Sequence, residues 1–459
     1  MTELLEPTLA PLAADRPPVE RRAVIPAGFA AGGAAIGIKA SGRPDLALVA
    51  STVGPVAAAA VFTPNRLAAA PVRHSRAQLL ATALAGEGRY GVATAIVATS
   101  GSANAATGAA GDADQARITA AAAAALGVGP STVLALSTGI IGVRLPLDRV
   151  LPGVADLAPG LVPTDAGLEA AARAILTTDS TIKVATTTVA LPDPDGLAVH
   201  PVRITGIAKG VGMIHPRMAT MLAVLLTDAA VAPELLSTML RRAAARTWDQ
   251  LSVDGDTSTN DTVFLLASGQ AEAAPLRAGS AEAAGLASGI EAVARDLARQ
   301  QAADGEGATT LLTTQVSGAV DDAEARAVAR AVVASSLVKT AIHGRDPNWG
   351  RIAGAAGNAV LADAAVLEAA GLPAEVAATR SGRPATVEPE RLRIAIAGHL
   401  VFDGGKGGPQ PFDRTAAAGA MAAPEVLVRL DLGLGGGTGE AFGCDLTETY
   451  VRENSEYTT

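Results

Sequence analysis

The chain has 459 residues and a formal net charge of −9, with 49% hydrophobic, 18% charged and only 2% aromatic residues. A chain of this length buries a large core, and that core must be built from Ala, Val, Leu and Ile because aromatic rings are so scarce. The acidic balance argues against nucleic-acid binding through phosphates. The single cysteine, Cys444, excludes a disulfide framework and a cysteine-based zinc cluster.

The first predicted element is a disordered tail over residues 1–23. The first 26 residues contain five prolines and no basic leader followed by an apolar stretch, so a secretory signal is not expected. The most apolar stretches, such as residues 120–126, are much shorter than the ~20 residues of a membrane span. These patterns predict a cytoplasmic protein that does not enter a membrane.

Helix and strand patterns alternate irregularly along the rest of the chain. Asp112 is expected to cap a helix that ends at Leu126. A second helix, ending near Asp304, is predicted by apolar residues spaced by four, three and four, namely Leu286, Ile290, Val293 and Leu297. Alternating apolar residues predict strands within residues 392–396 and 426–434. The expected fold class is α+β, with mixed sheets.

Residues 209–222, with the sequence KGVGMIHPRMATML, carry the most informative chemical pattern. A lysine lies on a glycine-bearing loop, and an apolar segment with one threonine follows it. Thr220 can be an ordinary β-branched strand residue. Alternatively, cleavage of the Ala219–Thr220 bond makes it a nucleophile whose own α-amine, with a pKa near 7.7–8.0, accepts the hydroxyl proton. Periodicity does not decide between the two interpretations.

This segment resembles the self-cleavage motif of the ornithine acetyltransferase family, the bifunctional acetyltransferases of arginine biosynthesis. Seven other segments resemble that family's motifs in the same order along the chain. They are residues 60–72, 100–108, 137–142, 177–179, 304–309, 343–351 and 450–459. Eight separated matches in one order identify the chain as similar to this family from about residue 24 to its end.

The resemblance implies a self-processing glutamate N-acetyltransferase that moves an acetyl group from N2-acetyl-L-ornithine to L-glutamate. Cleavage would leave residues 24–219 as the α chain, behind the tail, and residues 220–459 as the β chain. Thr220 is the implied nucleophile, and Thr138 and Gly139 are the implied oxyanion hole. The implied architecture is a layered sandwich shared with the aminopeptidases of the same structural superfamily.

The family pattern also implies the residues that bind substrate. They are Thr177, Lys209, Thr220, Glu306, Asn454 and Thr459. The expected partners are small-molecule substrates and the two chains of one precursor, assembled as an α2β2 heterotetramer. No cofactor is implied, although a bifunctional member would also use acetyl-CoA. The five histidines are far apart in the sequence, so no metal site is expected.

Other functions remain open from the sequence. A hydrolase of the same superfamily would use the same nucleophile with water as the acceptor. Val211 also occurs in antibiotic-cluster relatives of the family, so a specialised paralogue is a further alternative. A non-catalytic paralogue would require the loss of Thr220 or Thr138, and both are present. Thr310 stands where the family usually has a lysine, which puts any ion pair of that lysine in doubt.

Overall fold

The computed structural model of the chain describes residues 9, 12, 16–215 and 221–456. Two compact units make up the chain. The sandwich unit comprises Arg16–Ala244 and Asp256–Leu297, and the seven-stranded unit comprises Met1–Asp15, Ala245–Gly255 and Ala298–Thr459. The predicted cleavage point between residues 219 and 220 therefore falls inside the sequence of the sandwich unit, so the proposed α and β chains would both contribute to it.

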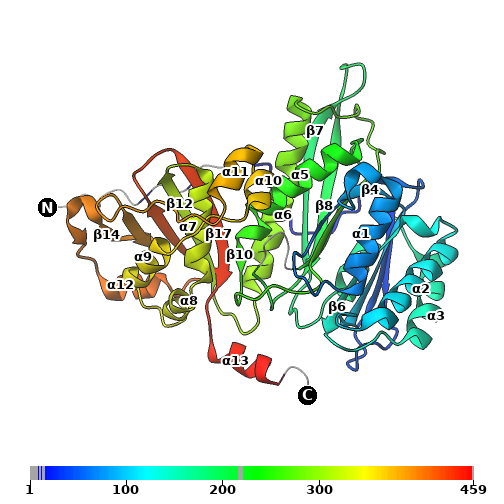
Figure 1. Ribbon diagram of the computed structural model, residues 1–459, viewed down its shortest axis with the longest axis horizontal. Helices are drawn as coiled ribbons and strands as arrows, with labels where there is room; N and C mark the ends of the chain where they lie inside the picture. The colour runs from blue at the N-terminus through cyan, green and yellow to red at the C-terminus, as the bar shows by residue number, and fades with distance from the viewer. Residues whose placement is uncertain (1–8, 10–11, 13–15, 216–220, 457–459) are drawn as a thin grey trace. The chain divides into compact units, whose positions relative to one another are not determined.

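Two mixed sheets form the sandwich unit (Figure 1). The four-stranded sheet has the order β1 (Phe29–Ala34), β2 (Leu46–Ser51), β5 (Ala95–Ser102) and β6 (Val133–Ile140). The six-stranded sheet has the order β4 (Tyr90–Ala93), β3 (Val56–Phe62), β11 (Thr262–Ala267), β9 (Leu222–Thr227), β8 (Val199–Lys209) and β7 (Lys183–Pro192). The pairs β5–β6 and β9–β11 are parallel, and the other neighbouring pairs are antiparallel.

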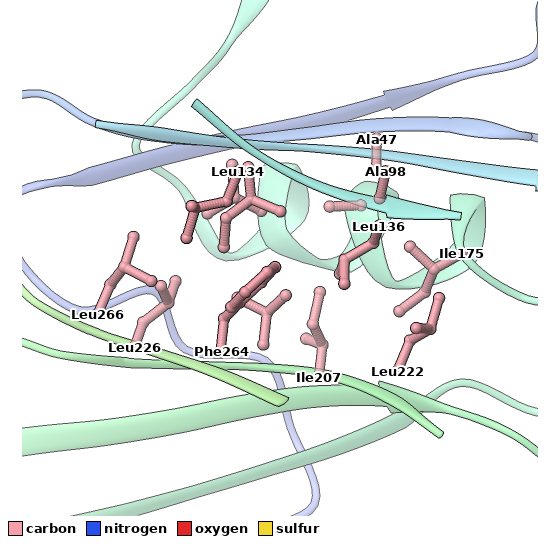
Figure 2. Close-up of a cluster of buried hydrophobic side chains, with 14 of the residues drawn as sticks. Ala47, Ala98, Leu134, Leu136, Ile175, Ile207, Leu222, Leu226, Phe264 and Leu266 are labelled. Atoms are coloured by element: carbon pink, nitrogen blue, oxygen red, sulfur yellow. The ribbon is translucent and has the colours of Figure 1, made fainter. Parts of the chain in front are cut away.

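Apolar side chains from the facing sides of the two sheets form one core. Figure 2 shows Leu134 and Leu136 of β6 pointing toward Phe264 of β11 and Leu222 of β9. Alternate residues of the same strands point away from this core, so a strand such as β2 is buried on both faces. This double burial explains the long apolar runs in the sequence. Each buried leucine contributes roughly 1.5–3 kcal/mol to folding.

Helices cover the outer faces of both sheets. Buried residues of α2 and α3, including Ile118 and Val150, share a second apolar cluster with the outer face of the four-stranded sheet. On the six-stranded sheet, a Cβ added to Gly206 of β8 would lie 2.6 Å from Leu297 of α6, so this glycine allows the helix to approach closely. The helices of this unit are α1 (Ala70–Thr82), α2 (Gly108–Leu126), α3 (Leu147–Leu157), α4 (Asp165–Ala174), α5 (Pro233–Arg246) and α6 (Ala281–Ala303).

The seven-stranded unit is built on one mixed sheet. Its strand order is β10 (Leu251–Ser252), β17 (Gly437–Cys444), β12 (Leu311–Ala319), β16 (Glu425–Asp431), β13 (Arg393–Ile396), β14 (His399–Asp403) and β15 (Gly408–Pro409). Its helices are α7 (Asp322–Ala334), α8 (Ser336–His343), α9 (Trp349–Gly357), α10 (Ala364–Ala369), α11 (Ala374–Arg380), α12 (Arg414–Ala420) and α13 (Glu448–Ser455). Buried residues of α7, α8 and α9 share one core with β12, β13 and β16.

The structure confirms the α+β class and most of the predicted elements. The helix predicted before Asp304 is α6, and its four predicted apolar residues are fully buried. The two predicted strands are β13 and β16, and β16 alternates between buried and half-buried residues as expected. The predicted start of α2 is wrong, because the helix begins at Gly108 after Thr107 and not at Asp112. Its predicted end at Leu126 is correct, with Gly127 in the left-handed conformation.

Residues 16–23 of the predicted tail contact the rest of the sandwich unit. The backbone of Glu20 exchanges two hydrogen bonds of 2.8 Å with Thr186 of β7. The Arg21 guanidinium contacts the Asp296 carboxylate at 3.0 Å. Backbone pairing thus begins at Glu20, three residues before the predicted end of the tail.

Candidate active site

Two predicted residues of the sandwich unit, Thr138 and Thr177, contact the amine of a third, Nζ of Lys209. Lys209 ends β8, Thr138 lies near the end of β6, and Thr177 follows α4 in the loop that leads to β7. The Lys209 amine donates a hydrogen bond of 2.6 Å to the Thr177 hydroxyl and one of 3.4 Å to the Thr138 hydroxyl. Three segments that are distant in the sequence therefore meet at this point.

The strand ends that carry Thr138 are shaped by two glycines. Gly139 has a φ of +125°, and Gly101, its partner in the β5–β6 register, has a φ of +116°. A Cβ on Gly139 would lie 2.4 Å from the carbonyl carbon of Gly101, so no other residue fits there. Thr138 and Gly139 are half-buried, whereas the preceding residues of β6 are buried. Exposed surface on β6 thus begins at Thr138 and Gly139.

A side chain of the neighbouring loop supports this strand end. The amide nitrogen of Asn260 donates to the carbonyl oxygens of Ala103, at 2.6 Å, and of Ser137, at 2.8 Å. The Ser137 hydroxyl donates in turn to the carbonyl of Ser102 at 3.0 Å. These bonds hold the backbone on the N-terminal side of Thr138, so its side chain starts from a fixed position.

Asp179 is the central anion of the site, and its side chain has no exposed surface. Its carboxylate accepts hydrogen bonds from Nζ of Lys183 at 2.7 Å, from the backbone N–H of Gly210 at 2.8 Å and from that of Thr177 at 3.0 Å. Nζ of Lys209 is 3.7 Å from Oδ2, the carboxylate oxygen that accepts from Thr177. Burial alone would raise the pKa of Asp179, but Lys209, Lys183 and the Gly210 N–H outweigh it and hold the pKa far below its usual range.

Asp179 therefore stays ionised at neutral pH and orients both partners of the site. It fixes the backbone of Thr177 and balances the charge of Lys209, while leaving the Lys209 amine within reach of two threonine hydroxyls. Sequence reasoning placed Asp179 only inside a motif and gave Lys183 no role. The four-residue spacing of these two opposite charges was the available signal, but the loop between them gives that spacing no fixed geometry.

The remaining predicted substrate residues belong to the seven-stranded unit. Glu306 is half-buried in the loop between α6 and β12, and its carboxylate accepts a hydrogen bond of 3.0 Å from the side-chain amide of Asn454 on α13. Thr447, which caps α13, donates its hydroxyl to the carbonyl of Gly307 at 2.8 Å. The structure thus brings Glu306 and Asn454 together.

Asp445 stabilises the loop between α6 and β12, which carries Glu306. The sequence patterns did not predict this role. Its buried carboxylate accepts from the backbone N–H groups of Thr309 and Thr310, at 2.8 and 2.9 Å, and from the Thr309 hydroxyl at 2.6 Å. The ring of His343 lies 3.1 Å from the same carboxylate. Thr310 stands where the family usually has lysine, and it contributes its backbone N–H to this network. The network therefore does not need the side chain at this position.

Three predicted residues lie outside the described part of the chain: Ala219, Thr220 and Thr459. Leu222, two residues after Thr220 in the sequence, begins β9 and pairs with Lys209 in the strand register. Within the described residues, no three His, Cys, Asp or Glu side chains are grouped so that they could hold a metal ion. No helix in the described part of the chain is long and apolar enough to cross a membrane.

Comparison with known proteins identifies the family. The profile of the ArgJ family matches residues 30–459. The chain belongs to the ArgJ family. It is 45% identical over 435 residues to the arginine biosynthesis bifunctional protein ArgJ of Thermus thermophilus, covering 95% of this chain and 99% of that protein. It is also 45% identical over 442 residues to the ArgJ protein of Thermosynechococcus vestitus, covering 94% of this chain and 96% of the relative.

A solved relative is the ornithine acetyltransferase of Mycobacterium tuberculosis complexed with ornithine, with 40% identity and a TM-score of 0.38, covering 44% of this chain and 99% of that chain. The family match and the two ArgJ relatives confirm the family expected from the sequence motifs. They also confirm that the chain is an enzyme, an acetyltransferase of arginine biosynthesis.

Proposed function

We propose that the chain cleaves itself between Ala219 and Thr220 and then transfers acetyl groups from N2-acetyl-L-ornithine to L-glutamate through an acetyl ester of Thr220. The observation that carries this proposal is the meeting of Lys209, Thr177 and Thr138 beside Gly139. These are the residues that the family resemblance assigns to substrate binding and to the oxyanion hole.

In the first half-reaction, the hydroxyl oxygen of Thr220 attacks the acetyl carbonyl of N-acetylornithine. The free α-amine of Thr220 takes the hydroxyl proton and passes it to the departing α-nitrogen of ornithine, so the C–N bond breaks as the ester forms. The Thr138 hydroxyl and the Gly139 N–H would donate to the negative oxygen of the tetrahedral intermediate. Donors of this kind contribute about 3–4 kcal/mol each to lowering the barrier.

In the second half-reaction, the α-amine of glutamate attacks the ester carbonyl. The C–O bond to Thr220 breaks, the proton of the attacking amine returns to the hydroxyl through the same α-amine, and N-acetylglutamate leaves. Neither step needs a cofactor, because the ester conserves the energy of the acetyl bond. The exchange is a ping-pong reaction with one product released before the second substrate reacts.

The family resemblance assigns substrate contacts to two sets of residues. In the sandwich unit, Lys209 and Thr177 would contact the substrate carboxylate, since a lysine amine and a hydroxyl both donate to carboxylate oxygens. In the seven-stranded unit, Glu306, Asn454 and Thr459 would contact the substrate, with the Glu306 carboxylate facing the ornithine ammonium. Use of acetyl-CoA as a second donor, an α2β2 assembly of the cleaved chains and a cytoplasmic location complete the proposal.

A product assay tests the transfer and separates it from hydrolysis. Purified enzyme is incubated with N-acetylornithine, with and without glutamate, and N-acetylglutamate and acetate are both quantified. The proposal predicts that glutamate receives most of the acetyl groups and that Thr220→Ala forms neither product. Acetate as the main product at saturating glutamate would contradict it and would favour a hydrolase.

A further inference from the structure

The loop between β1 and β2, residues 35–45, carries two cations beside the proposed site. Its backbone is fixed by Asp45, whose buried carboxylate accepts from the N–H of Ile36 at 2.7 Å and from the N–H of Lys39 at 2.9 Å. Lys39 therefore does not sit on a freely moving surface loop. Its side chain is half-buried, which is uncommon for a lysine that has no structural carboxylate partner.

Contacts place both cations against residues of the site. A Cβ added to Gly101 would lie 3.3 Å from Cγ of Lys39. The aliphatic part of the Lys39 side chain therefore packs against Gly101, the glycine that also contacts Gly139. Arg43 donates from its guanidinium to the carbonyl oxygen of Thr177 at 2.7 Å. Lys39 thus lies near the end of β6 that carries Thr138 and Gly139, and Arg43 lies beside Thr177.

Lys39 and Arg43 differ from Lys209 in whether a carboxylate lies close to the cation. Lys209 has the carboxylate of Asp179 at 3.7 Å. By contrast, neither Lys39 nor Arg43 has a carboxylate within 4 Å among the residues that the structure describes, and the Lys39 amine donates only to the carbonyl of Pro44, at 2.7 Å. Burial lowers the pKa of Lys39 to about 8, and the charges of Arg43 and Lys209 add to this effect. A cation in such surroundings is stabilised by an anionic ligand.

We propose that Lys39 and Arg43 form the subsite that receives the side-chain carboxylate of glutamate and of N-acetylglutamate. This inference rests on the proposed acetyl transfer and deepens it, because it assigns the reading of side-chain charge to residues outside the family motifs. Lys209, which already faces Asp179, is then left to contact the carboxylate that all the substrates share. Arg43 keeps a permanent charge, and its planar donors suit a carboxylate.

A lysine that titrates near neutral pH also suits a pocket that alternates between opposite charges. Glutamate brings a carboxylate, which holds the proton on Lys39. Ornithine brings an ammonium, and Lys39 can then release its proton to solvent at a small cost, because its pKa is only about 8. With Lys39 neutral, the subsite opposes the ornithine ammonium with the charge of Arg43 alone, whereas a lysine with an ordinary pKa would add a second charge throughout.

The test compares two acetyl donors, N-acetylglutamate and N-acetylornithine, by their kcat/KM values. In a ping-pong reaction this constant reports the donor half-reaction alone, whatever the acceptor. Lys39→Met should lower the ratio of the N-acetylglutamate constant to the N-acetylornithine constant by about tenfold or more, the loss expected for one charge-assisted hydrogen bond. Lys39→Arg should restore the ratio to within about threefold, since it keeps the charge. Lys406→Met, which removes an exposed lysine, is the matched control and should leave the ratio unchanged.

A second measurement uses only the wild type and so does not depend on the folding of a variant. The same ratio is followed from pH 6.5 to 9.5, because titration of the shared nucleophile cancels in it. The groups that face Lys39 are Arg43, Asp45, Lys209 and Asp179. Lys39 is charged below its pKa and neutral above it, so the ratio should be level in the acidic range and fall as the pH rises through about 8. Lys39→Arg should keep the ratio level.

The outcomes separate this inference from the proposed function. If the wild type accepts neither donor, the acetyl transfer itself is refuted. If it accepts both, a ratio that is insensitive to pH and to Lys39→Met overturns the subsite, and so does an equal loss with both donors. An effect confined to acetyl-CoA as donor would also overturn it, since Lys39 and Arg43 would then bind a phosphate group of that donor and not a side-chain carboxylate.

Discussion

The two units hold their proposed substrate residues by different means. In the sandwich unit, Lys209 is 8% exposed and lies in a network of buried charges centred on Asp179. In the seven-stranded unit, Glu306 is half-buried, and its loop is held by neutral donors, the backbone N–H groups and the hydroxyl that bond to Asp445. A buried ammonium needs an opposite charge, whereas a loop backbone needs only acceptors. We therefore expect that disrupting the network around Asp179 lowers the free energy of unfolding more than disrupting the bonds to Asp445.

The largest expected effect is that of Asp179→Asn. It removes the negative charge that two buried amines face, and breaking such a pair typically costs ~3–5 kcal/mol of unfolding free energy. Denaturant unfolding measures this cost. Asp112→Asn is the control, because its exposed pair with Arg73 should contribute less than about 1 kcal/mol. Similar small losses in both variants would contradict the role given to Asp179.

The pH dependence of this difference follows from the depressed pKa of Asp179. The carboxylate stabilises the fold at any pH above the ordinary carboxyl pKa, and this contribution is lost as the pH falls toward the folded-state value. The gap between wild type and Asp179→Asn should therefore be constant near neutrality and shrink below about pH 4.

Thr138→Ala changes the candidate site of the sandwich unit without removing a charge. It should lower kcat by about 10²–10³-fold and leave unfolding unchanged, because it deletes one of two proposed donors to the oxyanion. Thr138→Ser keeps the hydroxyl and should retain most of the activity. A loss of less than about threefold in kcat would show that Thr138 is only structural.

Glu306→Gln tests the proposed charge reading in the seven-stranded unit. It should raise the KM for N-acetylornithine by about tenfold or more, the loss of a charge-assisted hydrogen bond to the ammonium. The KM for N-acetylglutamate in the reverse direction should rise less. Glu453→Gln, an exposed glutamate on the same helix as Asn454, is the control. An equal rise for both substrates would mean that Glu306 supports the pocket and does not read charge.

The smallest expected effect is that of Asp445→Asn. It weakens bonds from neutral donors, so the expected cost is about 1–2 kcal/mol. Hydrogen exchange at the amides of Thr309 and Thr310 reports the local change, and their protection should fall before the global stability does. Unaltered protection of both amides would show that Asp445 does not hold the loop.

Sequence patterns predicted the elements whose burial is regular. The spacing of Leu286, Ile290, Val293 and Leu297 locates α6, and the alternation around Val426 locates β16. The start of α2 was missed because Asp112, a good capping residue, lies one turn inside a helix that begins at Gly108. A short polar side chain fits a helix end, but its type alone does not choose between two nearby starts.

The candidate site residues came from the family resemblance, and only from the segments where its motifs run. Lys209, Thr177 and Thr138 were expected to act together, and the structure joins them by hydrogen bonds. Asp179 and Asp445 were missed in their supporting roles, because the partners of a buried carboxylate come from segments that are far apart in the chain. Trp349, which lies in the motif at residues 343–351, stacks on Phe402 with ring centroids 4.9 Å apart.

The central claim is that Thr220 becomes an N-terminal nucleophile and carries the acetyl group. Intact-mass spectrometry of the purified protein, before and after brief incubation with N-acetylornithine alone, tests it in one measurement. We expect two chains that separate between Ala219 and Thr220, and after incubation the chain beginning at Thr220 should be heavier by one acetyl group. Thr220→Ala should stay a single chain and gain no acetyl group. A wild type that remains uncut after long incubation, or that transfers acetyl groups without ever carrying one on the chain beginning at Thr220, would contradict the account.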